Sequence, residues 1–370
     1  MQFTCEKNGL LKAISIASRA AVGKSPNPAL EGILIESGAE TVRFTCYDLT
    51  KAIYTDADAQ VSEPGSILLP ARLFESMVRK MPSGDVSVKT GQGSSVSVSC
   101  GRTRYEITGL NAGDFPVLPS VDSQAGVSLP ENILGCMIRQ TIFAVSDNEN
   151  RPLYTGELFE ISGGSLTVVA VDGYRLALRR EKLDSEDGEY SFIVPGKSLA
   201  ELEKLCSDSD DPVRITLGEK HISFAIDRTV LISRRLDGDF LNYRKAVPTE
   251  FAITVFASRA QIYDTVDRVA LTIDDRLKNP LRCVFDRDFV KMTSTSAIGS
   301  SEDFCAIDGD GKGLLIGFNN RYLLDILKDA PADELKICLN NGSSPCVMTA
   351  ADEENDSFLY MLLPVRLKAE

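Results

Sequence analysis

The sequence at residues 68–89, LLPARLFESMVRKMPSGDVSVK, decides the fold because its pattern occurs three times along the chain. A short apolar run leads through a turn into an amphipathic helix pattern, and a polar loop then leads into a run that alternates apolar with polar residues. The same succession occurs in residues 192–217, FIVPGKSLAELEKLCSDSDDPVRITL, and in residues 315–339, LIGFNNRYLLDILKDAPADELKICL. Such a repeat predicts one supersecondary unit used three times.

The three copies keep a nearly constant spacing. Anchored on Pro70, Pro195 and Asn319, they lie 125 and 124 residues apart. An earlier helix pattern precedes each copy, so each unit is expected to carry two helices. In this frame a basic residue occupies the same two helix positions in every copy: Arg72, Lys197 and Arg321, and then Arg79, Lys204 and Lys328.

The remaining sequence consists mostly of short alternating runs, such as TVRFTCYD, SVSVSC and LTVVAVD. Together with the helices they predict an α+β fold of three repeated domains, each with two helices packed on antiparallel sheets. Proline and polar residues cluster at 118–130 and 246–257, which predicts domains at 1–120, 128–248 and 250–370. The run YMLLPVRL, residues 360–367, is expected to form an exposed edge strand because Pro364 has no N–H to give to a ladder.

Composition limits the possible partners and compartments. The chain has 370 residues and a net charge of −13, which argues against a simple basic nucleic-acid binder. Its nine cysteines are scattered without a C-x-x-C pair, as is typical of buried free thiols in a reducing cytosol rather than of disulfides or a zinc site. No signal-peptide pattern or membrane-length apolar run is found. We expect a cytoplasmic protein with no membrane partner.

Catalytic and cofactor motifs are incomplete. The single histidine, His221, lies at an expected hairpin turn and is interpreted as a surface strand residue rather than a catalytic base. The run VPGKSLAE has Ser191 where a phosphate-binding loop needs its first glycine. The run IDGDGKG has Asn319 at the twelfth position, where a calcium loop needs a bidentate glutamate. We therefore expect no catalytic residue, metal or cofactor.

Five phrases, in order along the triplicated chain, resemble the bacterial sliding clamp family, the beta subunits of DNA polymerase III. They are PARLFESMVRKMP (70–82), FPVLP (115–119), VVAVDGYRLAL (168–178), DGDFLNYRKAVP (237–248) and LLPVRL (362–367). The resemblance implies a non-catalytic processivity factor: a head-to-tail homodimer whose six domains form a ring around duplex DNA. Helices would line the hole and sheets would form the outer wall. An acidic outer surface with relatively basic inner helices would then explain the net charge.

Contacts to DNA in such a ring would be independent of base sequence and sensitive to salt. The helices of the first domain carry a larger excess of basic over acidic residues than those of the third, so we expect the duplex to lean toward the first domain. The implied DNA-binding residues are basic residues of the helices and of one loop: Lys12, Arg19, Lys24, Arg72, Arg79, Lys80, Lys197 and Lys204.

Ring closure requires two complementary edges at opposite ends of the protomer. The resemblance implies that one edge is the strand GRTRYEITGL and that the other is the segment VDRVALTIDD, also taken as a strand. The implied dimer-interface residues are Arg102, Arg104, Tyr105, Leu271, Thr272 and Ile273.

A peptide-binding pocket is implied between the second and third domains. It would dock short linear motifs of replicative and translesion polymerases, the clamp loader, and mismatch-repair and ligase-type proteins, with Arg175 and Arg366 available to bond the peptide. Tyr154, Tyr174 and Lys245 differ from residues common in the family and leave peptide preference open. The implied pocket residues are Tyr154, Thr155, Val171, Gly173, Tyr174, Arg175, Leu176, Leu241, Lys245, Ala246, Met361, Leu363, Pro364, Val365, Arg366 and Leu367.

Two other classes stay open at the level of sequence. One is a clamp-like scaffold that binds peptides without encircling DNA, which would be a monomer or a dimer that is not retained on circular DNA. The other is a hydrolase or transferase whose site lies in loops without a recognisable motif. The single histidine and the incomplete phosphate loop argue against this enzyme.

Overall fold

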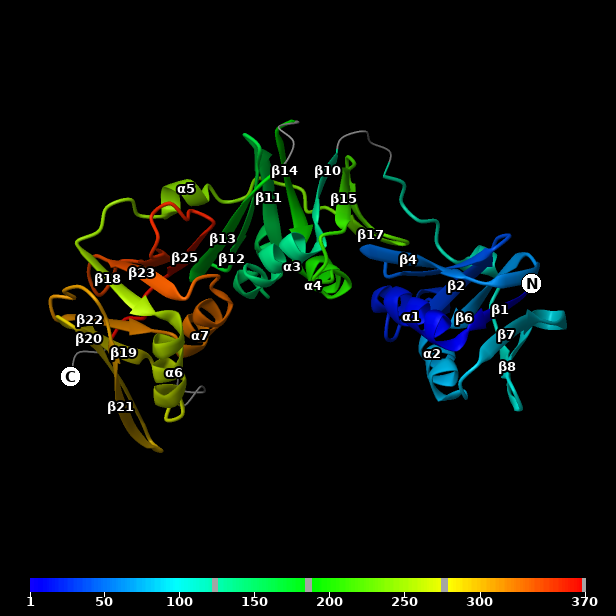
Figure 1. Cartoon of the computed structure of the whole chain (residues 1–370), viewed down its shortest axis with the longest axis horizontal. Helices are drawn as coiled ribbons and strands as arrows, with labels where there is room; N and C mark the ends of the chain where they lie inside the picture. The colour runs from blue at the N-terminus through cyan, green and yellow to red at the C-terminus, as the bar shows by residue number, and fades with distance from the viewer. Residues whose placement is uncertain (122–125, 184–187, 274–278, 368–370) are drawn as a thin grey trace. The chain divides into compact units, whose positions relative to one another are not determined.

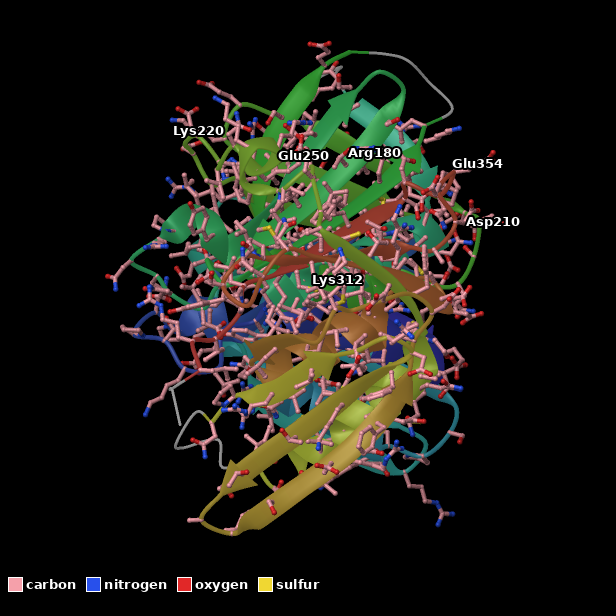
Figure 2. The ribbon with its side chains drawn as sticks, turned by 90° about the vertical axis from the view of Figure 1, so that its left-hand side faces the viewer. Arg180, Asp210, Lys220, Glu250, Lys312 and Glu354 are labelled. Atoms are coloured by element: carbon pink, nitrogen blue, oxygen red, sulfur yellow. The ribbon has the colours of Figure 1, made fainter. Side chains whose placement is uncertain are left out.

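A computed structural model describes residues 1–121, 126–183, 188–273 and 279–367 of the chain (Figure 1). The chain forms two compact units, one built from residues 1–134 and 201–235, the other from residues 135–200 and 236–370. Charged side chains such as Lys220 in the first unit and Glu250 and Glu354 in the second project from the surface (Figure 2). No helix among the described residues is both long and apolar enough to cross a membrane.

The helices confirm the threefold repeat. The first helix of each copy is α1 (Lys7–Ala17), α3 (Glu131–Arg139) or α6 (Arg259–Ala270), and the second is α2 (Ala71–Lys80), α4 (Gly196–Leu205) or α7 (Asn320–Asp329). Each second helix starts directly after its anchor residue, Pro70, Pro195 or Asn319. The side-chain oxygen of Asn319 accepts hydrogen bonds from the N–H groups of Arg321 and Tyr322 and so caps the start of α7. A short helix, α5 (Tyr243–Ala246), follows the second copy.

The first unit holds two antiparallel sheets. The five-stranded sheet has the order β5 (Gln60–Glu63), β1 (Gln2–Glu6), β7 (Asp85–Thr90), β8 (Ser95–Cys100) and β9 (Thr103–Thr108). The eight-stranded sheet has the order β10 (Gly126–Pro130), β15 (Pro212–Leu217), β16 (His221–Ile226), β17 (Thr229–Arg234), β4 (Lys51–Asp58), β3 (Thr41–Tyr47), β2 (Gly32–Ser37) and β6 (Gly65–Pro70). In this sheet β17 of the second copy pairs with β4 of the first, with Ser233 opposite Lys51.

The second unit repeats this plan. Its eight-stranded sheet has the order β14 (Tyr190–Pro195), β11 (Gly156–Ser162), β12 (Ser165–Val171), β13 (Arg175–Lys182), β25 (Phe358–Leu362), β24 (Cys346–Ala350), β23 (Glu334–Leu339) and β18 (Ile253–Ser258). Its four-stranded sheet has the order β21 (Gly299–Ala306), β20 (Phe289–Ser296), β19 (Leu281–Phe285) and β22 (Leu314–Phe318). Here β25 of the third copy pairs with β13 of the second, with Leu362 opposite Arg175.

The first residue of each first helix ties the two helices of its copy together. Lys7 Nζ donates to the carbonyl of Met81 directly after α2, and the guanidinium of Arg259 donates to carbonyls in the last turn of α7. Positive groups satisfy helix C-terminal carbonyls and complement the helix dipole. In the second copy Glu131 instead accepts from the backbone N–H of Ser207, after α4. The copies therefore share a contact although the residue type differs.

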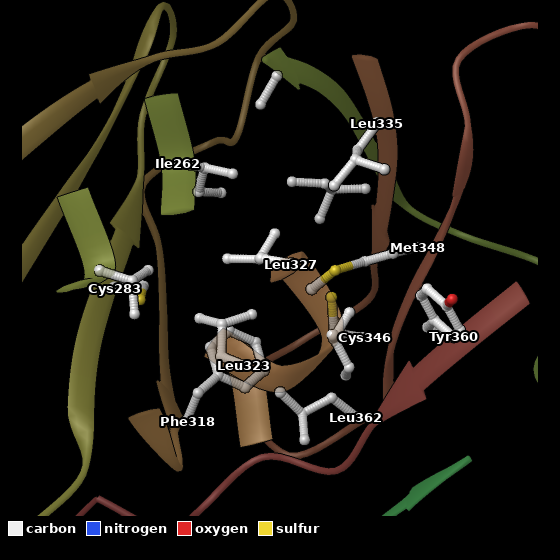
Figure 3. Close-up of a cluster of buried hydrophobic side chains, with 14 of the residues drawn as sticks. Ile262, Cys283, Phe318, Leu323, Leu327, Leu335, Cys346, Met348, Tyr360 and Leu362 are labelled. Carbon is white, nitrogen blue, oxygen red and sulfur yellow. The ribbon is translucent and has the colours of Figure 1, made fainter. Parts of the chain in front are cut away.

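The core of the third copy illustrates how the helices meet the sheets. Ile262 of α6 and Leu323 and Leu327 of α7 face Met348 and Leu362 of the eight-stranded sheet (Figure 3). Each buried side chain of this size contributes about 2 kcal/mol relative to solvent exposure. The helices α6 and α7 contact each other beside this sheet. The periodic apolar residues of the helix patterns thus mark the faces that are buried.

The cysteines are all free, as predicted. Seven are buried, whereas Cys136 and Cys206 are partly exposed. Burial raises the pKa of Cys5 to about 11 and that of Cys283 to about 12, so these thiols stay protonated at neutral pH. Among the described residues no group of His, Cys, Asp and Glu is arranged to hold a metal ion. His221 is the first residue of β16, and burial lowers its pKa.

The expected edge strand at residues 360–367 is wrong in two respects. Strand β25 ends at Leu362, and it lies between β13 and β24 rather than at an edge. The backbone then changes partners, because Leu363 N–H donates to the carbonyl of Tyr174 and Val365 N–H donates to the carbonyl of Gly317 in the other sheet, both at 2.8 Å. Pro364 stands between these two donors, where no N–H is needed.

A buried carboxyl group lies on β11 in the second unit. Glu157 is fully buried, and its Oε1 lies 3.1 Å from Thr141 Oγ1. The Thr141 hydroxyl also lies 2.8 Å from the carbonyl of Met137, and it has only one proton to donate. Burial raises the pKa of Glu157 well above its ordinary value of 4.5, and the hydrogen bond that Thr141 donates to it offsets this rise only in part.

We predict that Glu157→Gln gains stability relative to the unchanged protein as pH rises above 4.5. The folded carboxyl binds its proton more tightly than the unfolded one, so its contribution is complete at low pH and declines as pH rises toward the folded pKa. The relative gain is about 1.4 kcal/mol of unfolding free energy per pH unit within this window. Urea midpoints at pH 5, 6, 7 and 8 measure it. A pH-independent difference in stability between Glu157→Gln and the unchanged protein would contradict the assignment.

Candidate functional site

The implied DNA-binding residues differ in how their charge is compensated. Four have exposed side chains with no acidic partner within ion-pairing distance in the described chain: Lys12, Lys24, Arg72 and Lys80. The other four are paired with carboxylates: Arg79 with Glu75, Arg19 and Lys204 with Glu201, and Lys197 with Glu149. The uncompensated charge therefore gathers on α1, α2 and the loop before residue 25.

Arg72 and Lys24 come from different segments and lie close together. A Cβ atom placed on Gly23 would lie 2.6 Å from a guanidinium nitrogen of Arg72, so this guanidinium rests against the backbone beside Lys24. A side chain at residue 23 would displace it. The short glycine loop and the start of α2 thus form one positive patch in the first unit.

One implied dimer edge is an edge in the structure. β9 is the last strand of the five-stranded sheet and pairs only with β8 among the described strands. Arg104 and Tyr105 lie on β9, and Arg102 lies in the turn before it. The outer row of backbone N–H and carbonyl groups of β9 is open to a further strand.

The other implied dimer segment is not a strand in its described part, residues 266–273, which corrects the expectation there, and its last two residues lie outside the described residues. Leu271 N–H donates to the carbonyl of Arg268 and Ile273 N–H donates to that of Ala270, so residues 271–273 continue the turn of α6. Val269 and Ala270 are the last two residues of α6. The helical hydrogen bonds that follow them prevail over the strand propensity of residues 271–273. The free edge of the neighbouring sheet is β21, which pairs only with β20 among the described strands. Thr272 Oγ1 lies 2.7 Å from Ser301 Oγ on β21, so the two segments are adjacent.

A pocket of about 410 Å³ lies in the second unit. Four of the implied pocket residues line it, namely Tyr174, Leu363, Pro364 and Val365. The rest of the wall was not predicted from the sequence and comes from the start of α7 and from two flanking segments: Ile273, Asn279, Pro280, Asn319, Asn320, Arg321 and Tyr322. The α7 residues were visible in the sequence only as a helix pattern, and nothing in that pattern marks a pocket wall.

Of the other implied pocket residues, only two belong to a buried apolar cluster of the same unit. Leu176 and Met361 are buried in one cluster with Tyr243. The Tyr154 ring meets that of Phe240 at 5.9 Å, and Leu241 is exposed to 38%. The remaining members are Thr155 before β11, Val171 at the end of β12, Gly173 in the turn after it, Lys245 and Ala246 in α5, and the terminal Arg366 and Leu367. Arg366 is exposed, as a residue that bonds a peptide must be.

The short helix α5 is fixed to the sheet by a charged cluster. Tyr243 Oη donates to Glu160 Oε2 at 2.6 Å, and Arg244 donates to both carboxylate oxygens of Glu160. Burial raises the pKa of the Tyr243 phenol, with Glu160 adding to the effect. These bonds fix the positions of Lys245 and Ala246 relative to β11.

Arg175 is bonded within the chain instead of being open to a peptide. Only 9% of its side chain is exposed, and its guanidinium binds Asp172 at 3.0 Å and Asp325 at 2.5 Å. The guanidinium carbon also lies 4.2 Å from the ring centre of Tyr322. Its N–H groups already bind two carboxylates and one face of the guanidinium already lies against an aromatic ring, so Arg175 has little capacity left to bind an added ligand.

Comparison with known proteins defines the class. Models of the N-terminal, central and C-terminal domains of the DNA polymerase III beta subunit match residues 1–119, 128–242 and 244–366. Beta sliding clamps of Staphylococcus epidermidis and Bacillus subtilis are each 29% identical to this chain, covering 99% of it and 99% and 100% of their own lengths. The fold and these matches together are those of a DNA sliding clamp.

Solved structures agree over the whole chain. A DNA polymerase III beta subunit from Eubacterium rectale is 32% identical, covers 99% of both chains and has a TM-score of 0.94. The DNA polymerase sliding clamp from Bacillus subtilis is 28% identical, covers 100% of both chains and has a TM-score of 0.95. The chain belongs to the DNA polymerase III beta subunit family, the bacterial beta sliding clamps. The resemblance noted in the sequence is thereby confirmed, and so is the α+β fold of three clamp domains.

We predict that Gly317→Ala loosens the segment that follows β25. A Cβ at residue 317 would lie 2.6 Å from Leu367 Cδ2 and 2.9 Å from the Val365 carbonyl oxygen, so the segment must move and the Val365 N–H bond weakens. Loss of about 1 kcal/mol from this bond accelerates amide exchange at Val365 about fivefold. Hydrogen exchange read by NMR or mass spectrometry measures this rate. Gly113→Ala, where an added Cβ meets only ordinary contacts, is the control, and unchanged exchange at Val365 would contradict the prediction.

Proposed function

We propose that this chain is a DNA sliding clamp that encircles duplex DNA as a homodimer and tethers the replicative polymerase. It catalyses no reaction and takes no cofactor, and it works in the cytoplasm. The observation that carries the proposal is the full-length agreement of a triplicated fold with the Bacillus subtilis DNA polymerase sliding clamp, at a TM-score of 0.95. We also propose domain boundaries at 1–120, 128–248 and 250–370, which lie close to the ranges of the three matching domain models.

Ring closure is proposed to occur head to tail through two open sheet edges. β9 in the first unit and β21 in the second each have one unpaired side among the described strands. Pairing them between two chains would satisfy both rows of backbone groups and remove two aggregation hazards. Phe304 on β21 and Leu271 just after α6 are 50% and 79% exposed, and both would become buried in this interface.

Contact with DNA is proposed to involve mainly the four uncompensated cations, Lys12, Lys24, Arg72 and Lys80. Displacing counterions from phosphates supplies affinity without sequence preference, as sliding requires. The four paired cations, Arg19, Arg79, Lys197 and Lys204, have part of their charge neutralised by neighbouring carboxylates and would contribute less. This distribution supports a duplex that leans toward the first domain.

Peptide docking is proposed for the pocket beside Tyr174 and the apolar region around Leu176 and Met361. An apolar lining with a few polar groups suits a leucine or phenylalanine anchor of a short linear motif. The proposed partners are replicative and translesion polymerases, the clamp loader, and mismatch-repair and ligase-type proteins.

We predict that the chain is retained on nicked circular plasmid after incubation with a clamp loader and ATP, and is released when the plasmid is cut to a linear form. Encirclement alone gives this dependence on topology, and gel filtration of labelled protein measures it. Equal retention on linear DNA, or none on the circle, would contradict encirclement.

A second prediction concerns direct binding of the chain to DNA. Replacing Lys12 and Arg72 by alanine should lower the slope of log affinity against log salt concentration by about 1 for each phosphate that is no longer neutralised.

We predict that Phe304→Glu converts the dimer to single chains at micromolar concentration. A charge buried at the centre of the proposed β9–β21 pairing costs several kcal/mol, or more than a hundredfold in dimer affinity. Light scattering measures the mass. Val117→Asp, at a 93% exposed site on a loop, is the control and should remain dimeric. An unchanged protein that is already monomeric would argue against a stable ring.

A further inference from the structure

We propose that Arg175 and Asp325 form a brace that positions the aromatic wall of the pocket and so sets its affinity for peptides with an aromatic anchor. The inference rests on the proposed docking function and deepens it. Arg175 would act as a positioning residue, because its guanidinium is bonded within the chain and is shielded from solvent.

The guanidinium connects two elements that are 150 residues apart in sequence. Its Nε donates to Asp172 Oδ2 in the turn before β13, and its Nη1 donates to Asp325 Oδ2 on α7. Its flat faces are also occupied, since the ring centres of Tyr322 and Phe143 lie 4.2 and 5.4 Å from the guanidinium carbon. Two directional ion pairs and two ring contacts leave the turn and α7 little freedom to shift against each other.

Both of the braced elements contribute a pocket wall. Tyr174 lies in the turn, and Tyr322 lies on α7 about one helical turn before Asp325. Their ring centres are 6.2 Å apart. Tyr174 is 61% exposed, so few side-chain contacts hold its ring, and its position depends on the backbone of the turn. The same backbone accepts the N–H of Leu363, another pocket residue.

The first copy contains the same turn without the brace. Asp48 Oδ1 accepts from the N–H groups of Thr50 and Lys51, as Asp172 Oδ1 accepts from those of Tyr174 and Arg175. Leu49 has φ of 72° where Gly173 has 95°. The carbonyl of Thr50 accepts the N–H of Arg234 at 2.8 Å, matching the bond between Tyr174 and Leu363.

The difference between the copies lies in the helix partner. The residue that matches Asp325 in the repeat frame is Glu201, and its carboxylate pairs with Arg19 and Lys204 rather than with the lysine of the turn. Lys51 binds Asp48 within its own turn. The turn therefore folds without a bond to the helix, and the bond to Asp325 is an addition found where the pocket lies. Its role is to hold the pocket wall in place.

The test is a double-mutant cycle on the intact chain. A fluorescent peptide with a leucine followed by a phenylalanine as anchors is titrated against the unchanged protein and against Asp325→Asn, with anisotropy as the readout. Without the bond to Asp325, the aromatic wall of Tyr174 and Tyr322 should adopt the binding geometry about a tenth of the time. The affinity of Asp325→Asn for the phenylalanine peptide then falls about tenfold. A second peptide with alanine in place of phenylalanine should show a change of less than about twofold, because the coupling is confined to residues in contact.

Three further variants separate positioning from folding. Asp325→Glu keeps the carboxylate and should bind like the unchanged protein. Glu201→Gln, the repeat-equivalent change, should leave peptide binding unaltered. Thermal denaturation of Asp325→Asn should stay within a few degrees of the unchanged protein, because the Asp325 side chain is 44% exposed.

The outcomes are distinguishable. Equal affinity of Asp325→Asn and the unchanged protein for the phenylalanine peptide overturns the brace while leaving the docking function intact. An equal loss for both peptides also overturns it, because the effect is then not on the aromatic wall. If the unchanged protein binds neither peptide, the docking function itself fails and the brace fails with it.

Discussion

Antiparallel pairing between copies is the constraint on which the rest of the structure depends. β17 continues the sheet of the first copy through β4, and β25 continues that of the second through β13. An isolated copy would leave these strands with an open row of backbone donors and acceptors, which costs free energy when buried and invites aggregation when exposed. The triplication is therefore more than a repetition of independent domains, because each copy completes the sheet of the one before it.

The same constraint accounts for the position of the candidate pocket. After β25 ends, Leu363 and Val365 still need hydrogen-bond acceptors, and they find them in the turn before β13 of one sheet and on β22 of the other. A segment stretched between two sheets cannot pack its side chains into either core completely. Leu363, Pro364 and Val365 are left partly exposed beside Tyr174, and an apolar surface that can accept a ligand results.

Sequence patterns were sufficient for the repeat, the six long helices and the free cysteines, because each depends on local periodicity or composition. They failed at residues 271–273, where strand-forming residues follow a helix and complete its last turn. They failed again at residues 360–367, where an alternating pattern continues beyond the strand that it predicts. The pocket wall from α7 and the burial of Arg175 were also out of reach, since both depend on contacts between segments about 150 residues apart.

The distribution of thiols has a practical consequence for observing this protein. Seven of the nine cysteines are buried, and only Cys136 on α3 and Cys206 just after α4 are partly exposed. Access of the reagent to the sulfur governs alkylation together with thiolate formation, so buried thiols react slowly. A maleimide dye at a low molar ratio of dye to protein would attach first to these two residues of the second copy. The unchanged chain can thus be labelled selectively with a fluorophore. The seven buried cysteines need not be substituted first, which avoids leaving a cavity in the core at each of them.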